Sequence, residues 1–175
     1  TQTDAIGATR RITYDSASRI TSITESNGAK SSVVNDAAGR IISVTDALGY
    51  IEAYSYDAVG NITSQTDADG YTSYAQYDAL GRIIEAIDAA GGKTSYSYDI
   101  LGNVASSTDA LDNTESFVYD SEGQLLSHTD AAGNTETFEY DIMGNMVLHT
   151  DVVGAKTAYR YDAHGNMVEQ TDSLG

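Results

Sequence analysis

Acidic side chains recur in two registered rows along this chain, and carboxylate oxygens are the ligands that Ca²⁺ prefers in proteins. Within each row the acid returns every 21 residues, and the second row runs eleven residues behind the first. The rows comprise Asp4, Glu25, Asp46, Asp67, Asp88, Asp109, Asp130, Asp151 and Asp172, and Asp15, Asp36, Asp57, Asp78, Asp99, Asp120, Asp141 and Asp162.

A calcium ion needs about six to eight oxygen ligands. The densest acidic spot is formed by Asp67 and Asp69, together with Asp88 from the next repeat. Calcium-binding β-rolls use a nine-residue period with closely spaced glycines, which this chain lacks. We therefore expect no cofactor and keep calcium as the alternative, which a melting curve unchanged by chelator and by added calcium would exclude.

Histidines are the other candidate metal ligands. His128 and His149 occupy the same position in adjacent repeats, and His164 lies in a predicted turn. Equivalent positions of a hairpin meander lie two strands apart, roughly 10 Å, which is too far for one ion. We expect surface histidines and no metal site. No nucleophile, base and orienting group stand out, and identical repeated acids indicate a scaffold, so we expect no enzyme.

Nearly every acid of the two rows is followed by glycine three residues later, and this D-x-x-G spacing predicts a turn. Asp is favoured at the first position of a type I turn and Gly at the fourth, where φ is often positive. Such a turn followed by a left-handed Gly is a common hairpin connection with a bulge. Ser18 and Asp112 are the two exceptions to Gly. The predicted structural turn residues include Asp46, Gly49, Asp57, Gly60, Asp67, Gly70, Asp78, Gly81, Asp99, Gly102, Asp120, Gly123, Asp141, Gly144, Asp162 and Gly165.

The arms between the turns have strand length and contain β-forming residues, with no helical period. A tyrosine precedes most Asp residues of the second row, and an aliphatic residue follows five positions after the Asp. A bulged turn sets these two side chains opposite each other on neighbouring strands. We interpret the tyrosines as a core row: Tyr56, Tyr77, Tyr98, Tyr119, Tyr140 and Tyr161. Further apolar residues fall on the other face, which predicts that parts of both faces are covered: Ile42, Ile84, Leu126 and Val147.

Composition excludes several classes of protein. The 175 residues include 26 Asp and Glu against 9 Lys and Arg, a net charge of −17 that disfavours nucleic-acid binding. With no Cys there is neither a disulfide nor a thiolate metal site. No apolar run approaches the roughly 20 residues of a membrane-spanning helix.

Eight repeats without insertion or deletion cover residues 3–170, so we expect 1–175 to form a single array with partial units at both ends. About 16 strands in one flat sheet would span roughly 75 Å, and sheets of that size curve or fold back. The expected fold is all-β: tandem hairpins in a curved or spiralling antiparallel meander. A single hairpin cannot bury its own apolar face. We therefore expect a fragment of a longer chain, or a filament subunit, with low stability in isolation.

The motif Y-D-x-x-G-[RN]-[IVLM] followed by T-D-x-x-G resembles the Rhs (rearrangement hotspot) or YD repeat family. Residues 77–83 and 45–49 are clear instances, and the resemblance covers essentially the whole chain. It implies a hairpin meander that spirals into a large hollow shell. In bacterial polymorphic toxins and insecticidal toxin complexes such shells enclose a toxic C-terminal domain. In teneurins a related shell is part of an extracellular adhesion receptor.

Three departures from the family pattern leave the expected fold unchanged. Ala replaces the frequent Pro after the turn Asp at Ala5, Ala47, Ala68, Ala89, Ala110 and Ala131, and Ala also suits that turn position. The self-cleaving aspartates at the end of such shells have no counterpart here. The 175 residues themselves include no variable toxin domain.

The expected function is therefore a structural scaffold, part of a secreted or cell-surface shell around a C-terminal toxin, with a bacterial source. The alternatives are an extracellular filament or sheath and an adhesion module. The expected partners are further copies of the array or an enclosed toxin domain. Carbohydrate is a further candidate ligand, for which Tyr50 and Tyr71, just after a turn in adjacent repeats, are the candidate contacts.

Overall fold

The computed structural model describes residues 1–3 and 9–173, which form strands and turns and contain no helix. By contacts the chain divides into two units, Thr1–Gly92 and Lys93–Gly175. The first unit contains β1 (Gln2–Thr3), β2 (Thr9–Tyr14), β3 (Ile20–Thr24), β4 (Lys30–Asn35), β5 (Ile41–Thr45), β6 (Ile51–Tyr56), β7 (Ile62–Thr66), β8 (Thr72–Tyr77) and β9 (Ile83–Ile87). The second contains β10 (Lys93–Tyr98), β11 (Val104–Thr108), β12 (Thr114–Tyr119), β13 (Leu125–Thr129), β14 (Thr135–Tyr140), β15 (Met146–Thr150), β16 (Lys156–Tyr161) and β17 (Met167–Thr171).

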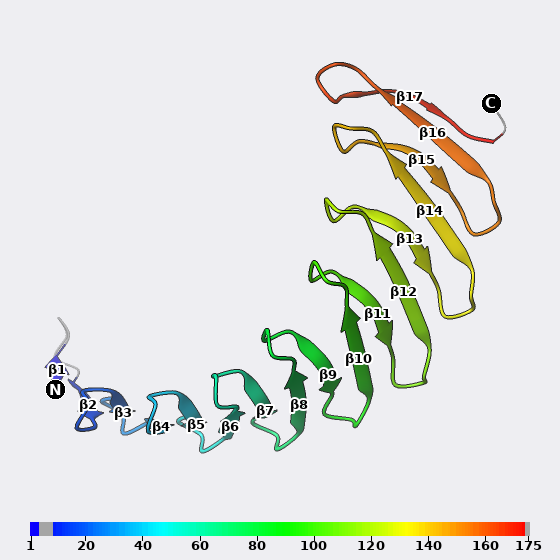
Figure 1. The fold of residues 1–175 in the computed structure, drawn as a ribbon. Helices are drawn as coiled ribbons and strands as arrows, with labels where there is room; N and C mark the ends of the chain where they lie inside the picture. The colour runs from blue at the N-terminus through cyan, green and yellow to red at the C-terminus, as the bar shows by residue number, and fades with distance from the viewer. Residues whose placement is uncertain (4–8, 174–175) are drawn as a thin grey trace. The chain divides into compact units, whose positions relative to one another are not determined.

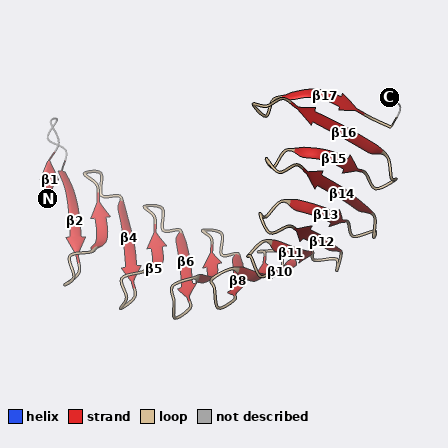
Figure 2. Cartoon of the chain, turned by 45° about the horizontal axis from the view of Figure 1, so that its top comes forward, coloured by secondary structure: helices blue, strands red, loops and turns tan. Residues whose placement is uncertain are grey.

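Within each unit every strand pairs antiparallel with the strand that follows it in the chain (Figures 1 and 2). The prediction of an all-β hairpin meander is therefore confirmed. A single array over residues 3–170 stays a prediction, because the chain divides into two compact units.

The turns are built alike at both ends of the hairpins. The carbonyl of the first turn residue accepts the N–H of the fourth at 2.9–3.3 Å, and its own N–H donates to the carbonyl of the fifth. The fourth residue has a φ of 78 to 108° at the glycines, the left-handed region that is open to Gly without steric cost. We call the turns that follow the tyrosine position Tyr-side turns, and those that follow the threonine position Thr-side turns.

Each Tyr-side hairpin carries a β-bulge just after its turn. In the β6–β7 pair, Tyr56 lies opposite Ile62, but Ser55 lies opposite Ser64, so Thr63 is an extra residue in β7. The Thr-side pair β5–β6 has an unbroken register. The predicted tyrosine–aliphatic pairing is confirmed here, and it recurs at the other Tyr-side hairpins, where Tyr77 faces Ile83 and Tyr161 faces Met167.

The bulge corrects the interpretation that a second apolar face runs along these strands. Ile42, Ile84, Leu126 and Val147 are the extra residues of their strands, because the register steps across each of them. Their apolar character therefore belongs to the bulge and does not mark a regular second apolar face.

We call the face that carries the tyrosine row the aromatic face; the opposite face is richer in Ser and Thr, although Tyr74 and Ile87 also lie there. No hydrophobic side chain is buried among residues 1–3 and 9–173, and Ser22, at 8% exposed, is the single buried residue there. Each unit is thus one layer thick, and its aromatic face is at most half-buried by lateral contacts within the sheet.

The two turns without glycine adopt the same backbone at a cost. Ser18 has a φ of 62° and Asp112 a φ of 63°. The left-handed conformation costs a residue with a Cβ roughly 1–2 kcal/mol, less for Asp than for Ser.

We expect Ser18→Gly to stabilise its hairpin by about 1 kcal/mol and Asp112→Gly by less, because only glycine adopts this backbone freely. Hydrogen exchange of the amides of β2 and β3 measures the first change, and those of β11 and β12 the second. Ser16→Gly, in the same turn, serves as the control. Stabilisation by Ser16→Gly equal to that by Ser18→Gly would contradict the strain argument.

Candidate functional site

The repeated unit that positions the side chains is a hydrogen-bonded aspartate, which we call an Asp staple, at the start of the turns from Asp15 to Asp162 other than the one at Glu25. Asp99 shows it in full: Oδ1 accepts the N–H groups of Leu101, Gly102 and Asn103 at 2.8–2.9 Å. Its Oδ2 accepts the side-chain amide of Asn103 at 2.9 Å. These hydrogen bonds, led by that of the Asn103 side chain, hold the pKa of Asp99 below its usual value. The carboxylate therefore closes the turn.

The partner of Oδ2 is the fifth turn residue, which sequence reasoning did not single out. In the Tyr-side turns it is Arg or Asn in all cases but one: Arg19, Arg40, Asn61, Arg82, Asn103, Asn145 and Asn166 each donate to the Asp four residues earlier. The exception is Gln124. The signal was present in the [RN] position of the repeated motif.

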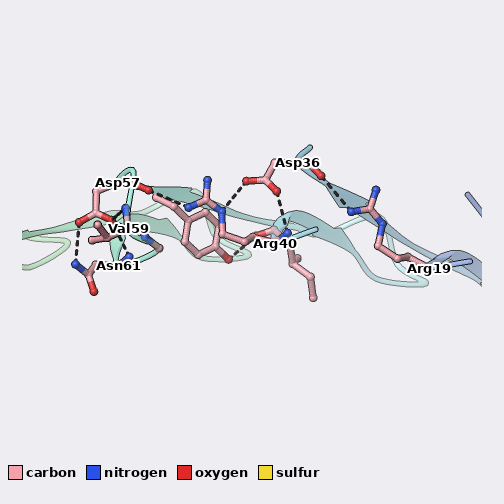
Figure 3. A network of polar contacts seen from close by, with 9 residues as sticks. Arg19, Asp36, Arg40, Asp57, Val59 and Asn61 are labelled. Atoms are coloured by element: carbon pink, nitrogen blue, oxygen red, sulfur yellow. Dashed lines mark hydrogen bonds and ion pairs between the residues drawn. The ribbon is translucent and has the colours of Figure 1, made fainter. Parts of the chain in front are cut away.

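Arginine at this position also reaches the next repeat, as Figure 3 shows. Arg40 Nε donates to Asp36 Oδ2 at 2.7 Å, and Nη1 donates to the carbonyl of Asp57 at 2.9 Å. The guanidinium carbon lies 4.7 Å from the centroid of the Tyr56 ring, within the range of a cation–π contact. Hydrogen bonds from the Arg40 backbone and then its side chain hold the pKa of Asp36 low.

Four tyrosines of the row connect their repeat to the preceding one through the hydroxyl. Each of the four donates to the carbonyl of the residue fifteen positions earlier: Tyr56 to Ile41 at 2.6 Å, Tyr77 to Ile62 at 2.8 Å, Tyr140 to Leu125 at 3.0 Å and Tyr161 to Met146 at 2.9 Å. Tyr98 and Tyr119 lie opposite Val104 and Leu125. All six rings of the predicted core row are half-buried and none is enclosed, because one layer covers a ring only from its sides. A core on this row requires a second layer.

In the acidic spot considered for calcium, Asp67 and Asp88 already accept backbone N–H groups as Asp staples. Oδ1 of Asp67 accepts the N–H groups of Asp69 and Tyr71, and Oδ1 of Asp88 accepts those of Ala90 and Gly92. Within the described parts of the chain, no three His, Asp or Glu side chains are grouped so that they could hold a metal ion.

His128 and His149 are not separate surface residues, as the sequence spacing suggested. Glu136, on the strand between them, accepts from both: Oε1 lies 3.0 Å from His128 Nδ1 and Oε2 lies 2.9 Å from His149 Nε2. Phe117 stacks on the His128 ring at 4.9 Å between centroids. The two histidines lie on β13 and β15, two strands apart as expected, but the prediction left out Glu136 on the intervening strand β14.

Three acids surround His128. Its Nε2 is buried without a hydrogen-bond partner, with Glu115 Oε2 3.5 Å away, and Asp130 adds a further negative field. The hydrogen bond to Glu136 is the main cause that raises the pKa of His128, and those from His128 and His149 lower the pKa of Glu136.

We expect the second unit to be more stable at pH 5.5 than at pH 8.5. A raised His pKa means that protonation stabilises the folded state, so this contribution is complete below the unfolded value of about 6.5 and is lost as pH rises through the folded pKa. Glu136 acts oppositely, since its lowered pKa stabilises the fold until pH falls through the folded value. Urea midpoints at the two pH values measure the difference. His128→Asn should abolish most of it and His164→Asn should not, whereas an unchanged difference in His128→Asn would contradict this account.

Tyr50 and Tyr71, the carbohydrate candidates, are 52% and 61% exposed. Their rings are available, and carbohydrate binding stays a prediction for a glycan array. No helix in the described residues is long and apolar enough to cross a bilayer.

Comparison with known proteins matches the repeats to one family. The family model described as Teneurin YD-shell matches residues 7–164. Among curated proteins there is no match.

Solved structures share the fold. A crystal structure of TcdB2-TccC3-Cdc42 superposes with a TM-score of 0.69 at 16% identity, over 96% of this chain and 10% of that chain. The Photorhabdus luminescens Tc holotoxin pore, with a mutant TccC3, gives 0.55 at 14% identity over 94% and 14%. TcdB2-TccC3 without its hypervariable C-terminal region gives 0.53 at 15% identity over 98% and 13%. The chain thus spans only a small part of the length of these proteins.

The family match covers residues 7–164, which is most of the chain. This chain therefore belongs to the teneurin YD-shell family.

Proposed function

We propose that this chain is a stretch of wall in a hollow YD-repeat shell, in a secreted or surface protein, and that the shell encloses a toxin polypeptide. The observation that carries the proposal is the uncovered aromatic face: no hydrophobic side chain of the described residues is buried. An apolar face of this kind requires cover from another layer or from an enclosed chain. The resemblance to Tc toxin structures supports a shell of this type.

Hydrogen bonds between neighbouring repeats also support the proposal that the chain forms part of a shell wall. The hydroxyls of Tyr56, Tyr77, Tyr140 and Tyr161, and the guanidinium of Arg40, bond one repeat to its neighbour at 2.6–3.0 Å. A layer without a core thereby gains connections from repeat to repeat, and a net charge of −17 keeps it from nonspecific association.

Electron microscopy of the purified chain separates a wall from a filament. We expect isolated, curved sheet fragments. Helical filaments of many copies would overturn the shell proposal and support the sheath.

The enclosing role of the aromatic face can be tested with a photo-crosslinking amino acid at Phe138 or at Glu139, neighbours on opposite faces of β14. We expect a reduced, carboxymethylated polypeptide without stable fold to cross-link preferentially from position 138. Equal cross-linking from both positions would contradict an enclosing aromatic face.

A further inference from the structure

Arg40 shows what fills the groove between two consecutive Tyr-side turns. Its guanidinium lies between the carboxylate of Asp36, the carbonyl of Asp57 and the ring of Tyr56. The carbonyl of Asp57 accepts Gly60 N–H as well, so the arginine uses its second lone pair. These three groups are supplied by the repeat and do not depend on the arginine.

The same groove exists four repeats later, without an arginine. A cavity of about 440 Å³ is lined by Asp120, Gln124, Tyr140 and Asp141, the counterparts of Asp36, Arg40, Tyr56 and Asp57. The carbonyl of Asp141 accepts Gly144 N–H and retains a lone pair, as at Asp57. The hydroxyl of Tyr140 is fixed on Leu125, so the ring is held as that of Tyr56 is.

Only one of the two carboxylate oxygens of Asp120 accepts hydrogen bonds in this groove. Asp120 Oδ1 accepts the N–H groups of Glu122 and Gln124 at 2.9 and 2.8 Å. Its Oδ2 has no hydrogen-bond partner among the described residues, in contrast to the other Tyr-side staples. Gln124 does not supply one, because its Nε2 is directed to the neighbouring turn, 2.9 Å from where a Cβ on Gly144 would lie.

The surroundings suit a long cationic side chain. Glu122 adds a second carboxylate to the lining, and the charge of Asp120 contributes to the raised pKa of Tyr140, after burial of the ring. Leu126 and the fully exposed Ile142 provide apolar surface for an aliphatic stem.

We propose that this groove, between the turns at Asp120 and Asp141, receives an arginine side chain of a partner polypeptide. The guanidinium donates to Asp120 Oδ2 and to the carbonyl of Asp141 and covers the ring of Tyr140. Its planar fork matches this set of acceptors and ring, whereas an ammonium is a compact charge without the fork. The site is independent of what the shell encloses.

An NMR titration of the chain with the blocked peptide acetyl-Gly-Arg-Gly-amide tests the proposal. We expect saturable shifts of the amides of Glu122, Gln124 and Gly144, weaker shifts with the lysine peptide and none with the citrulline peptide. Equal shifts with the lysine peptide, or shifts spread over all acidic turns, would show that the chain responds to positive charge in general. Either result would overturn the proposal of an arginine site.

Two variants locate the site. Gln124→Arg supplies the guanidinium from within the chain and should abolish peptide binding here, whereas Gln65→Arg, the same charge change in the other unit, should leave it. Asp120→Asn retains the Oδ1 acceptor and should weaken binding about fivefold, the factor that corresponds to about 1 kcal/mol. Unchanged binding in Gln124→Arg would overturn the proposal even if Asp120→Asn failed to fold.

Discussion

Asp99→Ala is expected to lower the melting temperature of the second unit by roughly 5–10 °C, because one substitution removes every hydrogen bond of a staple. Three backbone N–H groups and the amide of Asn103 lose their acceptor together. The turn between β10 and β11 then depends on its two backbone hydrogen bonds alone. Thermal unfolding followed by circular dichroism measures the change.

Asp99→Asn separates geometry from charge. The amide oxygen can still accept from the backbone, so we expect less than half of the loss seen with alanine. Glu139→Ala, which removes an exposed acid from the middle of a strand, is the control for net charge. A loss in Asp99→Asn equal to that in Asp99→Ala would show that the charge, and not the acceptor geometry, holds the turn.

Tyr77→Ala is expected to destabilise the first unit by about 2 kcal/mol. The ring packs opposite Ile83, and the hydroxyl donates to the carbonyl of Ile62 in the preceding repeat at 2.8 Å. Truncation of a fully buried aromatic costs about 3–5 kcal/mol, and this ring is half-buried. Urea denaturation of the chain measures the loss.

Two further variants separate the contribution of the Tyr77 hydroxyl from that of its ring and from the general effect of losing a tyrosine in this strand. Tyr77→Phe removes only the hydroxyl, for which we expect about 1 kcal/mol. Tyr74→Ala, on the same strand but the opposite face and 51% exposed, should cost clearly less. A similar loss at both tyrosines would mean that general strand propensity, and not the link between repeats, governs stability.

Sequence reasoning predicted the features that depend on one repeat alone. The D-x-x-G spacing indicated a type I turn with a left-handed fourth residue, and Gly60 at a φ of 108° has it. The tyrosine and the aliphatic residue were expected opposite each other, as Tyr56 and Ile62 are. Local rules suffice here because each turn is closed by residues no more than four positions apart.

Features that link different repeats were missed. The reach of Arg40 to Asp57 and the bridge of Glu136 between two histidines depend on side-chain direction across strands, which periodicity does not specify. A core on the tyrosine row stays a prediction for a related reason: the pattern shows which face is apolar but not whether a second layer exists to cover it.

The extra residue at Thr63 has a consequence for how such a chain can change in length. Side chains alternate between faces, so an unbroken ladder keeps equivalent residues on one face only if the repeat has an even number of residues. The repeat has 21, and one bulge per repeat compensates for the odd number. Deletion of Thr63 together with its bulge would leave every later repeat in phase. Loss of one strand residue with the bulge kept would exchange the two faces in all repeats beyond it, so viable insertions and deletions must come as whole repeats, as pairs, or with a bulge.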